Sequence, residues 1–169
     1  QTDKSLIVKQ LDQKHSYYAA LAKQIWKLAE PGYLENETTR LLQDELRREG
    51  FSIQSNVADM PTAFVASYGT GKPIIAVLAE MDALPGLSQD SVPFRKALVS
   101  NAYGHGCGHN LFGVGALNGF HQGNDGVGWR STGVTYASGR QRVVYQMSAG
   151  ASGLLFWKNG SAATPAFGM

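Results

Sequence analysis

The run "PIIAVLAEMD", Pro73 to Asp82, decides how the first part of this chain folds. It is apolar without interruption from Ile74 to Ala79 and then ends in two acids. A continuous apolar run of this length is typical of a strand that is covered on both faces, in a parallel or mixed sheet. The fold therefore has to supply further strands and helices to cover it.

The preceding 70 residues supply helices and strands. Apolar residues recur at helical spacing from Ser5 to Leu28, and Pro31-Gly32 ends that helix. A second helix is predicted from Asn36, its expected N-cap, to Gly50. Strands are predicted at 51–55 and 62–68, with a glycine turn at 69–71. Helices followed by buried strands predict a layered α/β domain.

Glu80 and Asp82 stand two residues apart where the apolar run ends. In extended backbone, residues i and i+2 point to the same side. Two carboxylates would then share one side of the carboxyl edge of the sheet, where open α/β sheets place their sites. The alternative is a solvated strand end that leads into a proline turn.

The stretch "NAYGHGCGHN", Asn101 to Asn110, holds the only cysteine and two of the four histidines, separated by single glycines. The thiolate of Cys107 and the imidazole of His109 are good zinc ligands, and glycines allow close ligands to converge. His105 is a further ligand or supports one. Asn110 is the expected cap of a helix that begins "LFGVGAL", Leu111 to Leu117.

Two other interpretations of this stretch stay open. One is a glycine loop with a buried thiol and a surface histidine. The other is a Cys–His nucleophile pair. The remaining histidines, His15 and His121, are read as structural or surface residues.

Composition narrows the class of protein. The 169 residues are 43% hydrophobic and 17% charged, as in globular domains. A formal charge of +2 is too small to argue for nucleic acid or an acidic membrane as partner, and no apolar run is long enough to cross a bilayer. One cysteine forms no internal disulfide. Because Gln1 is not a methionine, a cleaved signal peptide or a trimmed start is expected, so both cytoplasmic and exported locations stay open.

The last part of the chain differs in composition. From Ser91 onward the only acid is Asp125, against six Lys and Arg, and 15 of the 20 glycines follow Tyr103. No sustained helical or strand period is found beyond Gly119. The sequence therefore predicts two parts: residues 1–117 as a partial catalytic domain, and residues 118–169 as an anomalous, irregular tail.

Three stretches carry a resemblance to a known family. "KQIWKLAEPGYLE" (23–35), "MPTAFVASYGTGKPIIAVLAEMDALPGLSQ" (60–89) and "GHGCGHNLFGVGAL" (104–117) resemble the dinuclear metallo-amidohydrolases related to aminoacylases and zinc carboxypeptidases, the aminobenzoyl-glutamate utilization protein B-like group above all. The resemblance implies the N-terminal part of a three-layer α/β/α metallopeptidase catalytic domain. It also implies two divalent ions, zinc or manganese, a small-molecule amide substrate and a homodimer in the intact family.

The resemblance also implies roles for matching residues. Cys107 and His109 match the metal ligands of the Cys-Gly-His motif. Asp82 matches a catalytic acid that orients the site from just outside the metal shell. His105 matches a supporting histidine, and Glu80 stands where wider relatives carry a ligand histidine, so its role is uncertain. In such enzymes a water activated by the metal attacks an amide carbonyl, and a glutamate acts as general base.

The chain departs from the family after Leu117. The family continues with a Glu-Glu pair behind a "TPA" motif, but this chain has no glutamate after Glu80. Shifted by one nucleotide, codons for 121–126 can encode Ile-Lys-Glu-Met-Met-Glu, and those for 135–138 can encode Thr-Pro-Ala. The hypothesis is that the tail is read out of frame. The chain is then expected to be truncated and inactive, with weak or incomplete metal binding. A non-enzymatic remnant or binding module, and a Cys–His thiol enzyme, are the alternatives.

Overall fold

The computed structural model describes residues 3–69, 74–124, 130–131, 134–135 and 142–148. Three helices come from the predicted places: α1 (Asp3–Leu28), α2 (Asn36–Arg48) and α3 (His109–Asn124). A short 3-10 helix, η1, spans Val57–Asp59. No helix among these described ranges is long and apolar enough to cross a membrane.

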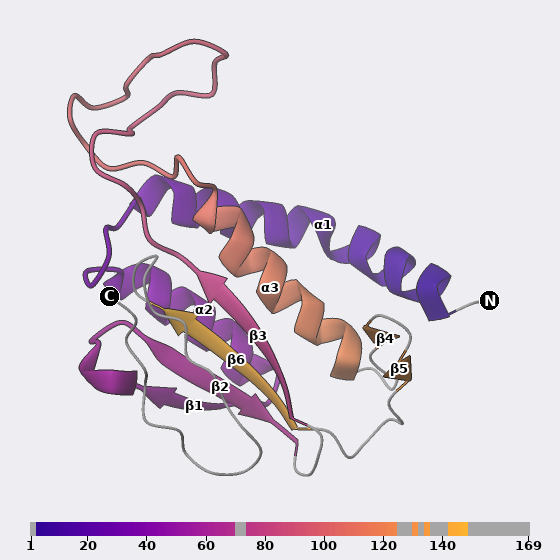
Figure 1. The fold of residues 1–169 in the computed structure, drawn as a ribbon. Coiled ribbons are helices and arrows are strands. Elements are labelled where there is room, and N and C mark those ends of the chain that lie inside the picture. Colours follow the sequence, from indigo (N-terminus) through magenta and orange to yellow (C-terminus); the bar gives the residue numbers. More distant parts are fainter. Residues whose placement is uncertain (1–2, 70–73, 125–129, 132–133, 136–141, 149–169) are drawn as a thin grey trace.

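Four strands form one mixed sheet in the order β1-β2-β6-β3 (Figure 1). They are β1 (Ser52–Ser55), β2 (Phe64–Tyr68), β3 (Ile74–Glu80) and β6 (Arg142–Ser148). Strand β2 is antiparallel to β1 and to β6, whereas β3 is parallel to β6. The two-residue strands β4 (Arg130–Ser131) and β5 (Val134–Thr135) pair with each other apart from this sheet. The mixed sheet agrees with the apolar run of β3, but the expected cover on both faces is not found among the described residues: β3 ends the strand order, and Leu78 on it is exposed.

The three helices cover one face of the sheet. Helices α1 and α3 lie side by side across it, and α2 packs nearer to β1 (Figure 1). Their shared core contains side chains from every helix and from the covered face of the sheet: Tyr18, Leu21, Ile25, Leu42, Leu46, Phe64, Ala66, Ala79, Val114 and Leu117. Burial of this apolar area is the main stabilising term for the domain. The described residues thus form two layers of the α/β/α arrangement.

Strand β6 corrects one expectation. The sequence beyond Gly119 shows no sustained strand period, yet Arg142–Ser148 lies inside the sheet between β2 and β3. The run "RVVYQMS" contains two valines and a tyrosine, which favour strands, but it is short and lacks strict alternation. Helix α3 also continues past Leu117 to Asn124. The boundary at residue 117 stays a prediction.

Two predicted helix caps are wrong. The N-cap residue of α2 is Glu35, and the Asn36 side chain donates to the Leu34 carbonyl instead. Helix α3 begins at His109, so Asn110 lies inside it rather than before it. In both cases a neighbouring contact holds the amide side chain away from the helix N–H groups.

The segment between β3 and α3 forms a long loop that projects away from the helices and the sheet (Figure 1). Two backbone hydrogen bonds between Leu84 and Gly104, at 2.9 and 3.0 Å, join its ends. A Cβ at position 104 would lie 1.9 Å from the Leu87 carbonyl oxygen, so only glycine fits where the loop closes. This closure brings Asp82 and His105, which flank the loop, to the same place.

Candidate metal centre

His109 lies between the two carboxylates at the end of β3. Its Nδ1 is 2.8 Å from Asp82 Oδ1, and its Nε2 is 2.8 Å from Glu80 Oε2. Both acids therefore point to the same side, as their spacing of two residues predicts. His109 is the first residue of α3, so the site joins the carboxyl end of a strand to the start of a helix.

The hydrogen-bond chemistry of this group requires one more proton or a metal ion between His109 and Glu80. Carboxylates only accept hydrogen bonds, and a neutral imidazole has one N–H. If that hydrogen is on Nδ1 and bonds to Asp82, then Nε2 and the Glu80 oxygen are two acceptors facing each other at 2.8 Å. A second proton on His109 satisfies both contacts, and so does a metal ion that both groups bind. A histidine with one nitrogen fixed by a carboxylate is an arrangement that metal-ligating histidines commonly have.

Backbone contacts hold Asp82 in this position. The neighbouring Ala83 N–H donates to the Glu30 carbonyl at 2.8 Å, and Ala83 also forms an isolated bridge with Pro31. Asp82 itself is buried, and Met81 before it is fully buried in the core. The segment between α1 and α2 thus supports the site from behind.

His105 lies beside this group without sharing its contacts. Its Nε2 lies 3.1 Å from the Ile25 carbonyl at the end of α1. Burial lowers the pKa of His105, the hydrogen bond to Ile25 opposes that change, and the neighbouring His109 adds to it. A neutral ring at this place donates to Ile25 through Nε2. His105 therefore ties α1 to the site, which fits a supporting role better than that of a ligand.

Asn110 makes a second tie to α1. Its Nδ2 donates to the Ala22 carbonyl at 3.2 Å, and the residue is buried. Together with His105 it fixes the start of α3 against α1. His109 thereby gains a fixed backbone as well as a fixed ring.

Cys107 is not brought to the carboxylates. Its thiol is free and exposed, in contrast to the buried thiol of the glycine-loop interpretation. Within the described part of the chain, no group of three or more His, Cys, Asp or Glu side chains has the geometry to hold a metal ion. Of the predicted site residues, the structure joins Glu80, Asp82 and His109, places His105 beside them and leaves Cys107 apart. His15 is exposed on α1, as expected, and the side chain of His121 lies outside the described residues.

The sequence pattern does not predict one further acid of this region, Glu35. Glu35 is fully buried behind the site and accepts a hydrogen bond from Thr62. Nothing in the local pattern distinguishes it from surface acids such as Glu37. Its burial follows from the way the segment between α1 and α2 folds back onto Asp82.

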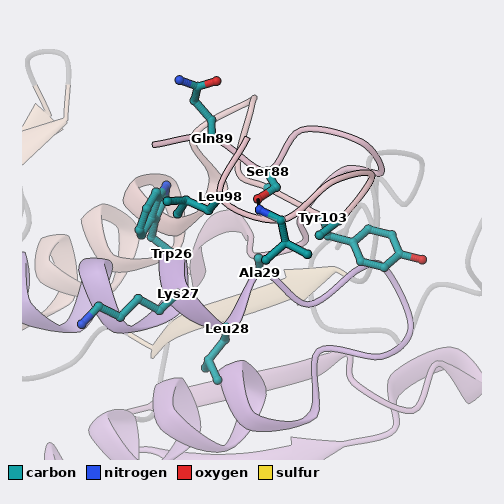
Figure 2. Close-up of a pocket in the computed structure, with 11 residues that line it drawn as sticks. Trp26, Lys27, Leu28, Ala29, Ser88, Gln89, Leu98 and Tyr103 are labelled. Atoms are coloured by element: carbon teal, nitrogen blue, oxygen red, sulfur yellow. Dashed lines mark hydrogen bonds between the residues drawn. The ribbon is translucent and has the colours of Figure 1, made fainter. Parts of the chain in front are cut away.

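A separate pocket of about 310 Å³ lies between the end of α1 and the long loop. Figure 2 shows the Trp26 ring beside Leu98, with Ser88 and Ala29 nearby. Lys27 and Gln89 point away from these residues. The pocket therefore presents mainly apolar groups and brings no charged side chain to its centre.

The chain is similar to known proteins over part of its length. No family model matches it. It is 44% identical over 101 residues to one of the subunits of p-aminobenzoyl-glutamate hydrolase from Escherichia coli, a match that covers 59% of this chain and 21% of that protein. It is 34% identical over 92 residues to thermostable carboxypeptidase 2 of Saccharolobus solfataricus, covering 53% and 23% of the two chains. The chain thus spans about a fifth to a quarter of these relatives.

A solved structure shares the fold. The YXEP protein of Bacillus subtilis, described as a dinuclear metal binding peptidase from the M20 family, superposes with a TM-score of 0.61 at 22% identity. The match covers 80% of this chain and 35% of that one. At this identity the likeness shows the fold alone.

Proposed function

We propose that Asp82, His109 and Glu80 belong to a metal centre for amide hydrolysis. The proposal is supported by the similarity of this chain to the N-terminal part of dinuclear metallo-amidohydrolases of the M20 family. The substrate class is an N-acyl amino acid or an aminobenzoyl-glutamate-like amide, because a close relative is a p-aminobenzoyl-glutamate hydrolase. The observation that carries the proposal is the doubly held His109, with 2.8 Å contacts on both nitrogens.

The donor set fits the metal in part. The imidazole nitrogen of His109 and the carboxylate of Glu80 would hold a divalent ion, zinc or manganese, and the Cys107 thiol is a further donor of suitable chemistry. When bound, such an ion polarises an amide carbonyl and makes water a stronger nucleophile. With such an ion bound, Asp82 would accept the Nδ1 hydrogen of His109 and leave Nε2, which faces Glu80, for the metal.

We propose in addition that these 169 residues alone do not complete the reaction. The resemblance calls for a glutamate as general base behind the "TPA" motif, and no glutamate follows Glu80. Cys107 is also apart from the carboxylates, which leaves few groups for an ion. Zinc affinity weaker than micromolar and no hydrolysis by the isolated chain are the expected results.

The shifted reading of the tail accounts for the missing acids. We propose that the DNA encoding the residues after about Leu117 contains an inserted or deleted base relative to an active parent gene. Sequencing the coding DNA from Ala116 onward tests this directly. A single base change that restores the Glu-Glu motif supports it, and a confirmed frame without any such reading contradicts it.

The decisive test compares the 169-residue chain with a frame-restored version. Both are assayed for release of aminobenzoate from p-aminobenzoyl-glutamate, with zinc or manganese added. The frame-restored protein should hydrolyse the substrate, and its His109→Ala variant should not. Activity in the given chain, lost on Cys107→Ser, would overturn the proposed incompleteness.

A binding module is the second candidate, favoured by the long loop. Phe94, Leu98 and Val99 are exposed on it. Leu98 and Val99 also line the apolar pocket, where Leu98 lies beside Trp26 (Figure 2). Clustered exposed apolar side chains invite association. Light scattering distinguishes the two candidates, because a binding module with exposed apolar side chains should associate. A compact monomer would argue against it. The third alternative, a Cys–His thiol enzyme, has no support among the described residues, because no described histidine forms a hydrogen bond with the exposed Cys107.

A further inference from the structure

The long loop between β3 and α3 carries a group of exposed apolar side chains. Phe94 is 63% exposed, Leu98 55%, Val99 61% and Tyr103 44%. Single exposed apolar residues are normal on a protein surface, but a group of them on one loop marks a contact site. Neither the core nor the metal centre uses these four side chains.

Hydrogen bonds fix the turn that presents Phe94. The Gln89 side chain donates from Nε2 to the Phe94 carbonyl at 2.8 Å, and its Oε1 accepts the Lys96 N–H at 3.0 Å. The Asp90 N–H donates to the Lys96 carbonyl at 2.8 Å, and the side chains of these two residues form an ion pair of the same length. These contacts close the turn around Phe94. An aromatic ring on an ordered backbone loses less entropy on binding than one on a free loop.

The same loop forms one wall of the apolar pocket at the end of α1. Leu98, Val99 and Tyr103 line the pocket from the loop, and Trp26 lines it from the helix (Figure 2). Its volume of about 310 Å³ is at the small end of ligand pockets, which span about 300–1,000 Å³, so it suits a single ring better than a larger molecule. Phe94 is not among the described residues that line it. Within one chain, the exposed ring and the pocket are therefore separate.

We propose that Phe94 of one copy enters the pocket between Trp26 and Leu98 of a second copy, whose own Phe94 enters the first pocket in return. An interface in which both copies use the same surface is the common form of a dimer, because every contact then occurs twice. The ring and the pocket are parts of one loop, so one twofold axis beside that loop brings both pairs together. The metal centre takes no part, and the inference does not rest on its function.

The charges around the ring and the pocket are compatible with this contact. Asp90 and Lys96 pair with each other in the turn, and Lys27 points away from the pocket (Figure 2). Arg95 is exposed next to Phe94 and stays at the rim of the contact. Repulsion between the two copies of Arg95 is screened beyond about 8–10 Å at ordinary salt. An uncharged ring therefore enters a pocket without a charged centre.

The size of the surface sets the strength of association to expect. Four exposed side chains from each copy form a contact at the small end of specific interfaces, below about 1,200 Å² in total. Such contacts are weak, so the dimer should form over protein concentrations of about 10 µM to 1 mM. Sedimentation equilibrium over this range measures it.

The test compares two variants of the contact with a matched control. Phe94→Ser and Trp26→Ala should each weaken the dimer at least about tenfold, because each removes one member of both ring–pocket pairs. Leu34→Ser is the control, since Leu34 is 59% exposed but lies between α1 and α2, and it should change the dimer less than about twofold. Wild type that stays monomeric up to 1 mM, or an equal loss in Leu34→Ser and Phe94→Ser, would overturn the inference.

Mixing the two variants tests the arrangement itself. The Phe94→Ser copy keeps its pocket and the Trp26→Ala copy keeps its ring, so a mixed pair regains one of the two contacts. The mixture should therefore associate more strongly than either variant alone, and no gain on mixing would overturn the inference. Circular dichroism checks that each variant is folded. Ala102→Leu, which fills part of the pocket from the loop side, replaces Trp26→Ala if the latter unfolds the chain.

Discussion

The hairpin of β1 and β2 and the pairing of β6 with β3 build one sheet in different ways. β1 and β2 are neighbours along the chain and lie antiparallel, with Ile53 opposite Ala66. β2 and β3 are also neighbours along the chain, but β6 lies between them and pairs with both. Part of the sheet therefore follows from local sequence, and the rest depends on a strand that enters from more than 60 residues away.

The largest effect on the sheet is expected from a substitution in β6, because this strand joins β2 to β3. Val144 pairs with Ser67 on one side and Ala76 on the other. A proline there removes a backbone donor from a central strand, so Val144→Pro should lower the free energy of unfolding by about 3 kcal/mol or more. Urea unfolding followed by circular dichroism measures this. Unchanged stability would mean that β2 and β3 do not depend on β6.

The second prediction concerns the site at the end of β3. Asp82→Asn preserves size but offers His109 an amide in place of the carboxylate, so the hydrogen on Nδ1 is no longer fixed. Zinc affinity should fall by about 10- to 100-fold, as for other partners of ligating histidines. Competition with a chromogenic chelator measures the change, and Asp90→Asn on the loop is the control. Equal affinities of Asp82→Asn and wild type would remove Asp82 from the site.

A smaller effect is expected in the core beneath the helices. Ile25 is fully buried on α1, and its carbonyl accepts His105. Ile25→Val removes one methylene while the backbone contact stays, so stability should fall by about 0.5–1.5 kcal/mol. Val8→Ala, at an exposed position of the same helix, should change stability by less than about 0.5 kcal/mol. Equal effects of the two would mean that α1 does not pack as described.

The smallest effect on stability is expected at Cys107. Its side chain is exposed and free, so Cys107→Ser should leave the free energy of unfolding within about 0.5 kcal/mol. If the Cys107 thiol moves to bind metal, Cys107→Ser should lower the zinc affinity and leave the metal-free stability unchanged. A large loss of stability without metal would show that Cys107 is packed rather than exposed.

Local patterns predicted most of the first 117 residues. Periodicity placed α1, α2, β1, β2 and β3, and the two-residue spacing of Glu80 and Asp82 predicted that both would face one side. The contact of both with His109 could not be read locally, because the loop closure at Leu84 and Gly104 creates it. The position of β6 depends on pairing between distant segments, which periodicity does not encode.

The two predicted helix N-caps are wrong because each asparagine side chain has another hydrogen-bond partner. Asn36 and Asn110 have the chemistry of N-cap residues, but each amide bonds elsewhere: Asn36 to Leu34, and Asn110 to Ala22 on α1. Glu30, six residues before α2, supplies the acceptors for the helix instead. The contacts of Asn36 and Glu30 are local, within eight residues along the chain, whereas the contact of Asn110 with Ala22 spans 88 residues and also fixes the start of α3 at the site.

The central claim is that His109 presents Nε2 to a metal while Asp82 holds Nδ1. The most direct test follows the two ring nitrogens of His109 by NMR while zinc is added in excess to the 169-residue protein. The account predicts that the Nε2 resonance shifts with zinc and that Nδ1 keeps its hydrogen on Asp82. Resonances of His109 that do not respond to zinc, or a response at Nδ1 instead, would contradict it.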